Sequence, residues 1–487
     1  MANRRSFKTD VSFLEKISIG ATGTKKVFDD LKNSGHYPIE LERGSMSFKI
    51  WKEIKIKRVR VPDLLCTKCG KRVESRAKTK LQISMSHSIA SPDRGWDFGL
   101  NDDDFVAFVE CKKAGDTPVD WCASDIVQYI KVKSLRDSFK DKKVLMERPK
   151  GVEEGFETRI TWPSAVAGAS GEISEINADR IKYKRNDGRI ISLSLKKKGN
   201  KLIPVVHEKD KVAESQIIAS VVPVQTEFHC GKEQTASDYF KMLKSSSLSD
   251  RYASAKALAN FNTKEVIPVL EEKMEDQKEH IYIRLEAAAS ILKLDSTESI
   301  DFLKRTLSDD YLENRLECVI ILGEIRNKNS SKLLIEVLLD KTQHPEIRAG
   351  AAWALGELKG KEPLDALVSV FDDIDINIKA ESARSLLKLA KFFRKDIIQY
   401  FASGSEDARA GISWALGKNG EFSIKDLLPL MVDENARKWI AWIIGTQKEE
   451  KFISEIEDLK KKDKEVYFAT TVLWKILSSW INGLELY

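Results

Sequence analysis

Apolar positions in the C-terminal half of the chain recur at helical spacing, in short segments that each begin with a basic residue. The clearest segment is Arg348-Ala-Gly-Ala-Ala-Trp-Ala-Leu-Gly, and Arg409-Ala-Gly-Ile-Ser-Trp-Ala-Leu-Gly repeats it closely. Similar segments begin at Arg251, Arg284, Arg315, Lys379 and Arg437, so that successive starts lie 33, 31, 33, 31, 30 and 28 residues apart. A second apolar segment, such as Leu333–Leu339, precedes the basic residue. Each unit is therefore predicted to be a pair of helices.

A single helix pair cannot bury its apolar face, so units of this kind stack on their neighbours. Ala and Gly at interior positions allow close helix approach, while Leu and Ile fill the seam between units. The segments resemble HEAT-like repeats of the type named for phycobilisome lyases. The resemblance implies a helical solenoid over 238–450. Residues 451–487 lose the repeat and are expected to be capping helices, and the net acidic sequence of this half favours a protein partner for the array. We also expect the leading Arg to bond an acid in the preceding turn, as Asp309 precedes Arg315.

Between these helices and residue 150, the pattern changes to short β-rich segments separated by turns. Asp187-Gly188 is a strong hairpin turn, because it tolerates the positive φ that such turns require. Close spacing of short strands predicts a small β-barrel or SH3-like domain over 151–237. The predicted strands are 158–162, 171–176, 180–184, 189–195, 201–206 and 218–224.

The stretch Trp96–Lys113 predicts a hairpin, because a polar turn at Asn101–Asp104 separates two short segments and the second is apolar and β-rich. Trp96–Leu100 and Phe105–Cys111 are expected to be strands joined by a polar turn. Side chains alternate along a strand, so Glu110 and Lys112 share one face, and Asp97 on the partner strand can reach the same end. Two carboxylates and an amine at one sheet edge can hold a hard divalent cation and polarise an attacking water.

This arrangement resembles the PD-(D/E)xK nuclease family over roughly residues 1–150, on the strength of Asp97, Glu110 and Lys112. The resemblance implies an α/β restriction-endonuclease-like domain in which Asp97 and Glu110 bind Mg²⁺, or Mn²⁺, and Lys112 orients or deprotonates water. It also implies a helix, here 119–139, followed by a strand at 142–146. Upstream, Gly23–Asn33 reads as a helix, and 37–41 and 48–60 read as strands.

A second set of residues fits the same family pattern less well. Pro62-Asp63 precedes a tight turn, after which Glu74-Ser-Arg76 stands where the family has Glu-x-Lys. Arginine is a poor substitute because its high pKa prevents it from acting as a base. Asp63 and Glu74 are therefore an alternative catalytic pair, or they supply an extra acid to the first site. Glu40 and Glu42 lie near in sequence and could add a carboxylate.

Cys66-x-x-Cys69-Gly is half of a zinc ribbon, with the Gly that a knuckle turn uses. A structural zinc needs four ligands, and no second Cys-x-x-Cys exists. The candidates to complete the set are His87, Cys111 and Cys122, at irregular spacing. A hairpin turn with two free thiols is the alternative interpretation.

Charge is distributed unevenly. Residues 1–237 contain 44 Lys and Arg against 33 Asp and Glu, whereas the rest of the chain has 37 against 42. A basic surface suits a phosphate backbone, so nucleic acid is the expected partner of the N-terminal half. Apolar and basic residues alternate over 49–60, which predicts one buried and one cationic face. The expected phosphate-contacting residues are Lys55, Lys57, Arg58, Arg60, Lys78 and Lys80.

Length and composition complete the picture. At 487 residues and 32% charged, the chain is long enough for several domains, and it is expected to be multidomain α+β. Its first residues lack the apolar core of a secretion signal, no run approaches the roughly 20 apolar residues of a membrane span, and six Cys are too few for a disulfide scaffold. A cytoplasmic location without membrane contact is therefore expected.

Two functions fit these observations. One is a metal-dependent nuclease with a HEAT array that binds partner or substrate, for which the family resemblance implies a role in microbial antiviral defence or repair. The other is a non-catalytic nucleic-acid-binding or scaffold protein, with a degenerate nuclease-like or zinc-knuckle N-terminal domain.

Overall fold

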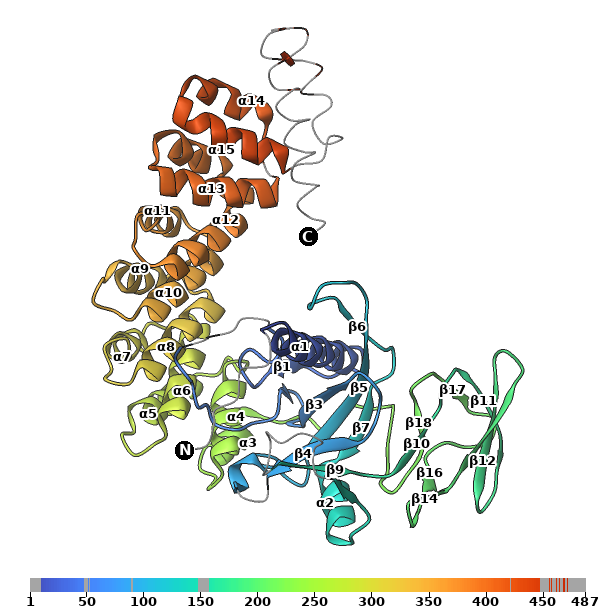
Figure 1. Cartoon of the computed structure of the whole chain (residues 1–487). Coiled ribbons are helices and arrows are strands. Elements are labelled where there is room, and N and C mark those ends of the chain that lie inside the picture. The colour runs from blue at the N-terminus through green and yellow to red at the C-terminus, as the bar shows by residue number, and fades with distance from the viewer. Residues whose placement is uncertain are drawn as a thin grey trace, which may run out of the picture. The chain divides into compact units, whose positions relative to one another are not determined.

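The computed structural model describes residues 10–47, 51, 53–88, 91–147, 157–420 and 422–446, together with positions 455, 457, 461, 464, 467, 468 and 471. The chain divides into two compact units (Figure 1). The first comprises Met1–Ile50 and Arg58–Val269, and the second comprises Trp51–Lys57 and Leu270–Tyr487. No helix in the described ranges combines the length and the apolar character needed to cross a lipid bilayer.

The first unit is built on a mixed sheet that helix α1 (Asp10–Asn33) covers on one face (Figure 1). The strand order is β1-β2-β3-β5-β6, and β7 also pairs with β5. Only β3 and β5 run parallel, while the other pairs in this sheet are antiparallel. The strands are β1 (Pro38–Glu40), β2 (Leu64–Cys66), β3 (Arg72–Lys78), β5 (Phe105–Lys113), β6 (Trp121–Ala123) and β7 (Gln128–Lys131).

Helix α1 sits unusually close to the sheet. A Cβ atom added at Gly23 would lie 2.5 Å from the Cβ of Ala77 on β3, so only glycine permits this approach. Val27 and Leu31 of α1 are buried with Val73 and Val109 of the sheet in one core. Strand β5 is apolar on both faces and buried along most of its length, which explains its continuous apolar sequence.

A second core continues from this sheet into the following β-rich region. Trp162 is fully buried, its ring centroid lies 5.2 Å from that of Trp96, and its indole N–H donates to the Leu135 carbonyl. One small sheet has the order β4-β9-β8, and two others have the orders β10-β18-β16 and β13-β12-β11-β17. One hydrophobic core therefore runs through both predicted N-terminal domains, and the predicted boundary at 150 falls outside the described residues.

These strands agree with most of the predicted ones. Their bounds are β4 (Ser84–Ser88), β8 (Leu145–Glu147), β9 (Glu157–Thr161), β10 (Ser164–Val166), β11 (Gly171–Ile176), β12 (Arg180–Arg185), β13 (Ile190–Ser194), β14 (Lys196–Lys197), β15 (Asn200–Lys201), β16 (Ile203–Pro204), β17 (Lys211–Val212) and β18 (Ile217–Ser220). Gly188 has φ +86, as its hairpin turn between β12 and β13 requires.

The C-terminal half consists of paired helices, as predicted. The helices that carry the repeated basic residue are α4 (Leu248–Leu258), α6 (Ile281–Lys293), α8 (Leu312–Ile325), α10 (Pro345–Leu358), the first part of α12 (Ile376–Ser403), α13 (Glu406–Asn419) and α15 (Glu434–Gly445). Their partners are α3 (Ala236–Met242), α5 (Val266–Glu275), α7 (Ile300–Thr306), α9 (Ser330–Leu339), α11 (Lys361–Ser369), the part of α12 beyond its kink at Phe393, and α14 (Ile424–Leu427) with η2 (Leu428–Val432).

Three predicted elements are wrong. Residues 96–99 form turns after the short helix η1 (Pro92–Arg94), not a strand. The segment 119–139 is not one helix, because Gln128–Lys131 has strand-forming residues that pair with β5, and helix α2 (Val132–Lys140) starts only afterwards. The described part of 48–60 contains no regular strand, and 48–50 and 52 lie outside the described residues. The predicted capping helices over 451–487 also lie largely outside them.

Candidate functional site

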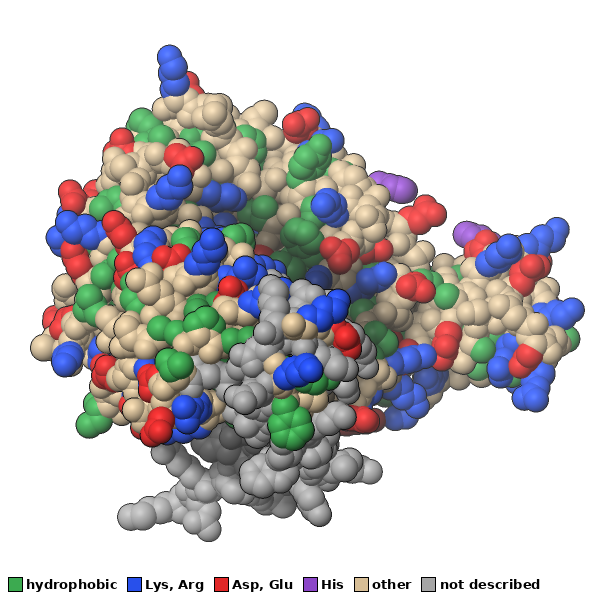
Figure 2. All heavy atoms as spheres, turned by 90° about the horizontal axis from the view of Figure 1, so that it is seen from above, with side chains coloured by type: hydrophobic (Ala, Val, Ile, Leu, Met, Phe, Trp, Pro, Cys, Tyr) green, Lys and Arg blue, Asp and Glu red, His purple; other side chains and the backbone are tan. Residues whose placement is uncertain are grey.

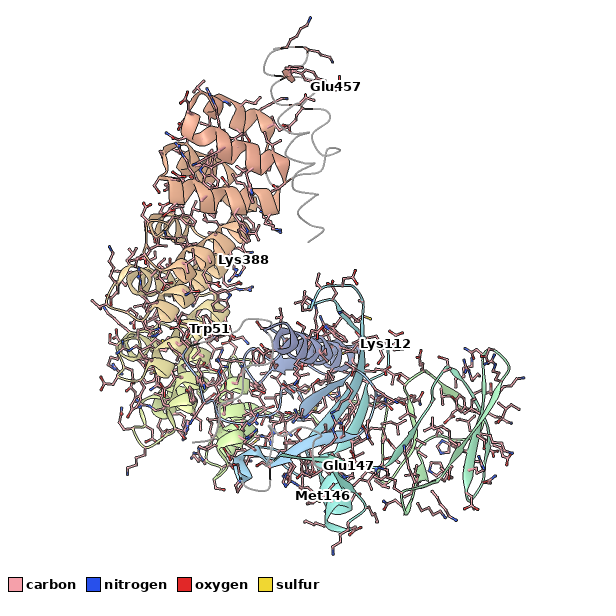
Figure 3. The ribbon with its side chains drawn as sticks, in the orientation of Figure 1. Trp51, Lys112, Met146, Glu147, Lys388 and Glu457 are labelled. Carbon is pink, nitrogen blue, oxygen red and sulfur yellow. The ribbon has the colours of Figure 1, made fainter. Side chains whose placement is uncertain are left out.

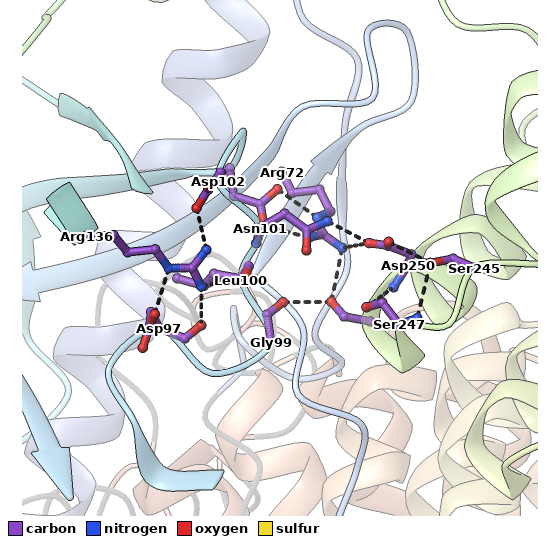
Figure 4. A network of polar contacts seen from close by, with 12 residues as sticks. Arg72, Asp97, Gly99, Leu100, Asn101, Asp102, Arg136, Ser245, Ser247 and Asp250 are labelled. Atoms are coloured by element: carbon purple, nitrogen blue, oxygen red, sulfur yellow. Dashed lines mark hydrogen bonds and ion pairs between the residues drawn. The ribbon is translucent and has the colours of Figure 1, made fainter. Parts of the chain in front are cut away.

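The predicted triad of Asp97, Glu110 and Lys112 is not assembled as expected. Asp97 belongs to a turn-rich loop, and its carboxylate accepts from Arg136 Nε at 2.7 Å (Figure 4). Arg136 also donates to the Asp97 and Leu100 carbonyls and to the carboxylate of Asp102, so it holds the whole loop. The physical reason for the error is the missing strand at 96–100: the neighbours of β5 are β3, β6 and β7.

Glu110 and Lys112 do share one side of β5, but they face other partners. The buried Glu110 carboxylate accepts from the Ser215 hydroxyl, and the Lys112 amine lies 3.8 Å from it. Lys112, near the end of β5 (Figure 3), donates to Glu214 at 2.8 Å. That bond, with the charges of Glu214 and Glu110, raises the pKa of Lys112. The amine therefore stays protonated at neutral pH and is unsuited to accept a proton from water.

The alternative pair, Asp63 and Glu74, lies close together, and Glu42 joins it. Strands β2 and β3 pair Leu64 with Val73, which puts the two acids at the adjacent position of the hairpin. The backbone N–H groups of Leu41 and Glu42 donate to the Asp63 carbonyl at 2.7 and 3.2 Å, which brings the third acid alongside. The Asp63 carboxylate is buried and accepts the Ser75 N–H at 2.7 Å.

Three acids near one another in a desolvated place repel. Burial first, and then Glu74 and Glu42, raise the pKa of Asp63 well above its ordinary value. Burial and Glu74 likewise raise the pKa of Glu42, although Arg60, Arg58 and Arg76 oppose the shift. Arg76 pairs with Glu74 at 2.8 Å. Such a cluster is expected either to hold protons or to attract a cation.

The predicted phosphate-contacting residues are spread over different settings. Lys55, Lys57, Arg60 and Lys80 are exposed, while the apolar Ile54 and Val59 are buried. Arg58 is partly buried and donates to the Arg43 carbonyl. On the face drawn in Figure 2, basic and acidic side chains are interspersed. Nucleic-acid binding by these residues stays a prediction.

Lys78, like Arg58, is half-buried. Its amine donates to the Ser84 carbonyl at 2.5 Å. Burial, followed by the charges of Arg76 and Arg159, lowers its pKa to about 8. A lysine in this state is partly neutral near physiological pH, and it can exchange a proton more readily than a surface lysine.

A separate cluster brings together one histidine and three cysteines. Donor atoms of His36, Cys66, Cys69 and Cys230 all lie within 4.8 Å of one another, and within the described ranges this is the single group of three or more His, Cys, Asp or Glu that meets that limit. Cys66 and Cys69 were predicted, but the completing residues are others. The proposed ones lie elsewhere: His87 faces Trp96 and Phe139, Cys111 approaches the Ile19 carbonyl, and Cys122 is exposed.

Sequence reasoning missed His36 and Cys230 because they are 30 and 161 residues from the nearest Cys of the pair. One signal was available: Cys230-Gly231 repeats the Cys69-Gly70 dipeptide. A hydrogen bond from Cys66 is the main cause that lowers the pKa of Cys69, and backbone N–H groups of Lys71 and Gly231 add to it.

In the repeat array, the leading Arg side chains connect neighbouring units. The predicted partner was an acid in the preceding turn, but Arg315 donates to the backbone carbonyl of Asp309. Arg348 does likewise to the Leu338 carbonyl at 2.9 Å, and its other end pairs with Asp373 of the next turn at 2.6 Å. Arg409 repeats this pattern with Phe401 and Asp433. Arg348 and Arg409 thus cap one helix and reach toward the following unit, and Arg315 reaches it by donating to Gln343 at 3.0 Å.

Comparisons with known proteins support the helical repeats of the C-terminal half. A family model for HEAT repeats matches residues 238–315 and 306–387, so the C-terminal half carries HEAT-like repeats. No curated protein sequence matches the chain. Neither finding supports a PD-(D/E)xK domain in the first 150 residues.

Several solved structures resemble the chain weakly. A complex of CpcE and CpcF of phycocyanin lyase from Nostoc is 16% identical, with 51% of this chain and 96% of that chain covered and a TM-score of 0.27. Human deoxyhypusine hydroxylase is 13% identical over 43% of this chain and 96% of that chain, with a TM-score of 0.24. A designed armadillo repeat protein for peptide recognition is 16% identical over 44% and 100%, with a TM-score of 0.24.

Proposed function

We propose that this protein is a binding protein whose HEAT-like array docks a partner protein. The observation that carries the proposal is a set of exposed apolar side chains at equivalent places in the second unit. Tyr311, Ile374 and Val432 are 65%, 100% and 83% exposed. Tyr311 is the N-cap of α8, and the other two immediately precede the N-caps of α12 and α15.

Stacking in register supports a common edge for these three residues. A Cβ at Gly323 of α8 would lie 2.8 Å from the Cβ of Ala354 of α10, and one at Gly356 would meet Ser385 of α12. A Cβ at Gly350, near the start of α10, would also meet Leu316, near the start of α8. These helices therefore contact start to start and end to end and run parallel, so their N-terminal turns follow one edge. Large apolar side chains repeated along an edge are typical of an interaction surface.

The experiment uses the full chain in its host cells with a proximity-labelling tag. A protein enriched by the wild type is expected to be lost with Tyr311→Ser, Ile374→Ser and Val432→Ser combined. The matched control replaces Leu339 and Phe392, which are 48% and 54% exposed but lie away from these turns. Equal enrichment by wild type and triple variant, with both folded by circular dichroism, contradicts the proposal.

A second candidate function is cation-dependent phosphodiester hydrolysis, and the acidic cluster of Glu42, Asp63 and Glu74 favours it. Carboxylate oxygens are the ligands that Mg²⁺ prefers, and a cation would relieve the repulsion that raises the Asp63 pKa. The placement also suits the family pattern better than Asp97 and Glu110 do, since Asp63 directly precedes β2 and Glu74 lies on β3. The fit is incomplete, because the three acids do not form a group as tight as the cysteine cluster.

In this candidate, Glu42, Asp63 and Glu74 would hold Mg²⁺ or Mn²⁺, which would polarise a phosphoryl oxygen and acidify bound water. Arg76 could donate to the phosphate in bidentate fashion, but it cannot take a proton. The expected substrate is a nucleic acid, in line with the basic composition of this half.

Hydrolysis is tested with linear duplex, plasmid and single-stranded substrates in Mg²⁺ and Mn²⁺. Cleavage is expected to fall by at least about 100-fold in Asp63→Asn and Glu74→Gln, the scale of loss for a group that activates the nucleophile or holds the metal. Asp97→Asn is the matched control, because that acid binds Arg136 and is expected to leave cleavage unchanged. If the wild type cleaves none of these substrates in a metal-dependent way, the hydrolysis candidate is rejected and the binding function remains.

A further inference from the structure

We propose that His36, Cys66, Cys69 and Cys230 bind one structural zinc ion. His36 lies between α1 and β1, Cys66 ends β2, Cys69 lies in the β2–β3 turn, and Cys230 lies in the segment before α3. Cys66 and Cys230 have their sulfurs 3.9 Å apart, and Cys69 Sγ lies 3.6 Å from His36 Nδ1.

These separations suit tetrahedral coordination. With Zn–S bonds of about 2.3 Å, two sulfurs at tetrahedral angles lie about 3.8 Å apart, and a sulfur and an imidazole nitrogen are slightly closer. A disulfide needs about 2.05 Å between sulfurs, so the Cys66–Cys230 distance is that of two ligands and not of a bond. Three sulfurs and one nitrogen select zinc over hard cations such as Mg²⁺.

The surroundings orient the donors toward a common point. His36 Nε2 lies 2.9 Å from the Phe228 carbonyl, so this nitrogen carries the proton and donates it. The lone pair of Nδ1 then faces Cys69, and the Phe228 ring stacks on the imidazole at 4.9 Å between centroids. A hydrogen bond to the second nitrogen is what fixes the tautomer of a histidine ligand.

Backbone N–H groups complete the arrangement around the sulfurs. Tyr37 N–H donates to Cys66 Sγ at 3.3 Å, and the N–H groups of Lys71 and Gly231 bond Cys69. Gly70 has φ +72, the conformation that the Cys-x-x-Cys-Gly turn requires. Such bonds stabilise thiolate, which is the form that binds metal.

The proposed ion has a structural consequence within the first unit. In the β2–β3 turn, the Lys68 carbonyl accepts a hydrogen bond from the Gln234 N–H at 2.6 Å, and the Thr67 carbonyl accepts one from the Tyr239 hydroxyl of α3. Through the proposed ion, Cys230 would therefore connect the segment before α3 to the β2–β3 turn of the sheet. All four positions are taken by protein donors, which is typical of a structural zinc site and leaves no place for substrate.

The test measures metal content of the full chain, purified without chelator, by inductively coupled plasma mass spectrometry. We expect about one zinc per chain in the wild type and in Cys122→Ser, whose exposed thiol is outside the cluster. Cys230→Ser is expected to retain less than about a tenth of that amount after dialysis against a chelator. His36→Cys keeps four donors and is expected to keep zinc.

Cobalt substitution gives a readout independent of zinc content and of fold. Wild type and His36→Cys are expected to show the absorption of tetrahedral thiolate-bound Co²⁺, and Cys230→Ser is expected to lose it. Metal-free wild type that keeps its thermal unfolding midpoint, or a Cys66–Cys69 disulfide in protein isolated under reducing conditions, overturns the proposal. A Cys230→Ser variant that binds as much zinc as wild type overturns it as well.

Discussion

Replacing Asp63 by Asn is expected to make the protein more stable, because this acid is held in an unfavourable place. Its side chain is 8% exposed, and Glu74 and Glu42 add to the effect of burial in raising its pKa. An asparagine oxygen can still accept the Ser75 N–H that Asp63 accepts at 2.7 Å. The substitution therefore removes charge repulsion and desolvation cost while it keeps the hydrogen bond.

We expect a gain of about 0.5–2 kcal/mol in the free energy of unfolding at pH 7.5, the usual range for one stabilising substitution. The sign with pH follows from linkage. The pKa of Asp63 is higher in the folded protein than in the unfolded chain, where it is about 3.9. The free energy of unfolding of the wild type therefore bears no penalty from Asp63 below that pH, and it falls as pH rises through the folded pKa. The advantage of Asp63→Asn should thus be greatest at neutral pH and should vanish below about pH 4.

Urea unfolding without added Mg²⁺ or Mn²⁺, at several pH values, measures this difference. The control is Asp104→Asn, which changes another buried acid whose pKa is also raised, chiefly by burial. Asp104 receives two bonds from the buried Arg72, at 2.8 and 2.6 Å. Its loss is expected to cost about 3 kcal/mol, the low end for a broken buried ion pair because Asp250 still pairs with Arg72. Destabilisation by Asp63→Asn at pH 7.5 refutes the reasoning.

Two further pairs of substitutions test packing. Gly23→Ala is expected to destabilise the protein by about 1–3 kcal/mol because its Cβ would collide with Ala77. Gly20→Ala on the same helix meets nothing within 4 Å and should stabilise the protein by up to about 1 kcal/mol. Thermal unfolding compares the two variants, and equal effects contradict the close approach of α1 to β3. Arg348→Ala removes two buried bonds and should lower the free energy of unfolding in urea by about 3–5 kcal/mol. The control, Arg305→Ala, removes an exposed ion pair and should lower it by less than about 1 kcal/mol. A similar small loss in both variants argues against an ion pair that stabilises the contact between repeats.

The helical array was predictable because its signal is repeated. Each unit states the same Arg-led, Ala-rich pattern, so substitutions such as Lys379 do not obscure it. All seven predicted starts lie on helices of the structure. What the pattern did not reveal is the partner of each Arg, since a backbone carbonyl leaves no trace in the sequence. Arg315 and the Asp309 carbonyl illustrate this limit.

The N-terminal sites were harder to predict, since their members are distant in sequence. A local pattern favoured Asp97 with Glu110, and it failed because one segment of the hairpin was a loop held by Arg136. Strand pairing instead brings Asp63 beside Glu74, and a backbone contact adds Glu42. Short segments of acid and apolar residues do not distinguish a strand from a loop, and register decides which side chains meet.

The two clusters of the first unit differ in what a cation would do there. The donors around Cys69 are already within bonding geometry, so a metal there would fix structure that hydrogen bonds have prepared. The acids around Asp63 form a less compact group than the cysteine cluster and repel one another, so the charges that would attract Mg²⁺ also lower the stability of the folded protein. Removing charge at Asp63 and removing a ligand at Cys230 should therefore change stability in opposite directions. That contrast distinguishes a site kept at a cost for binding or chemistry from a site that holds the fold together.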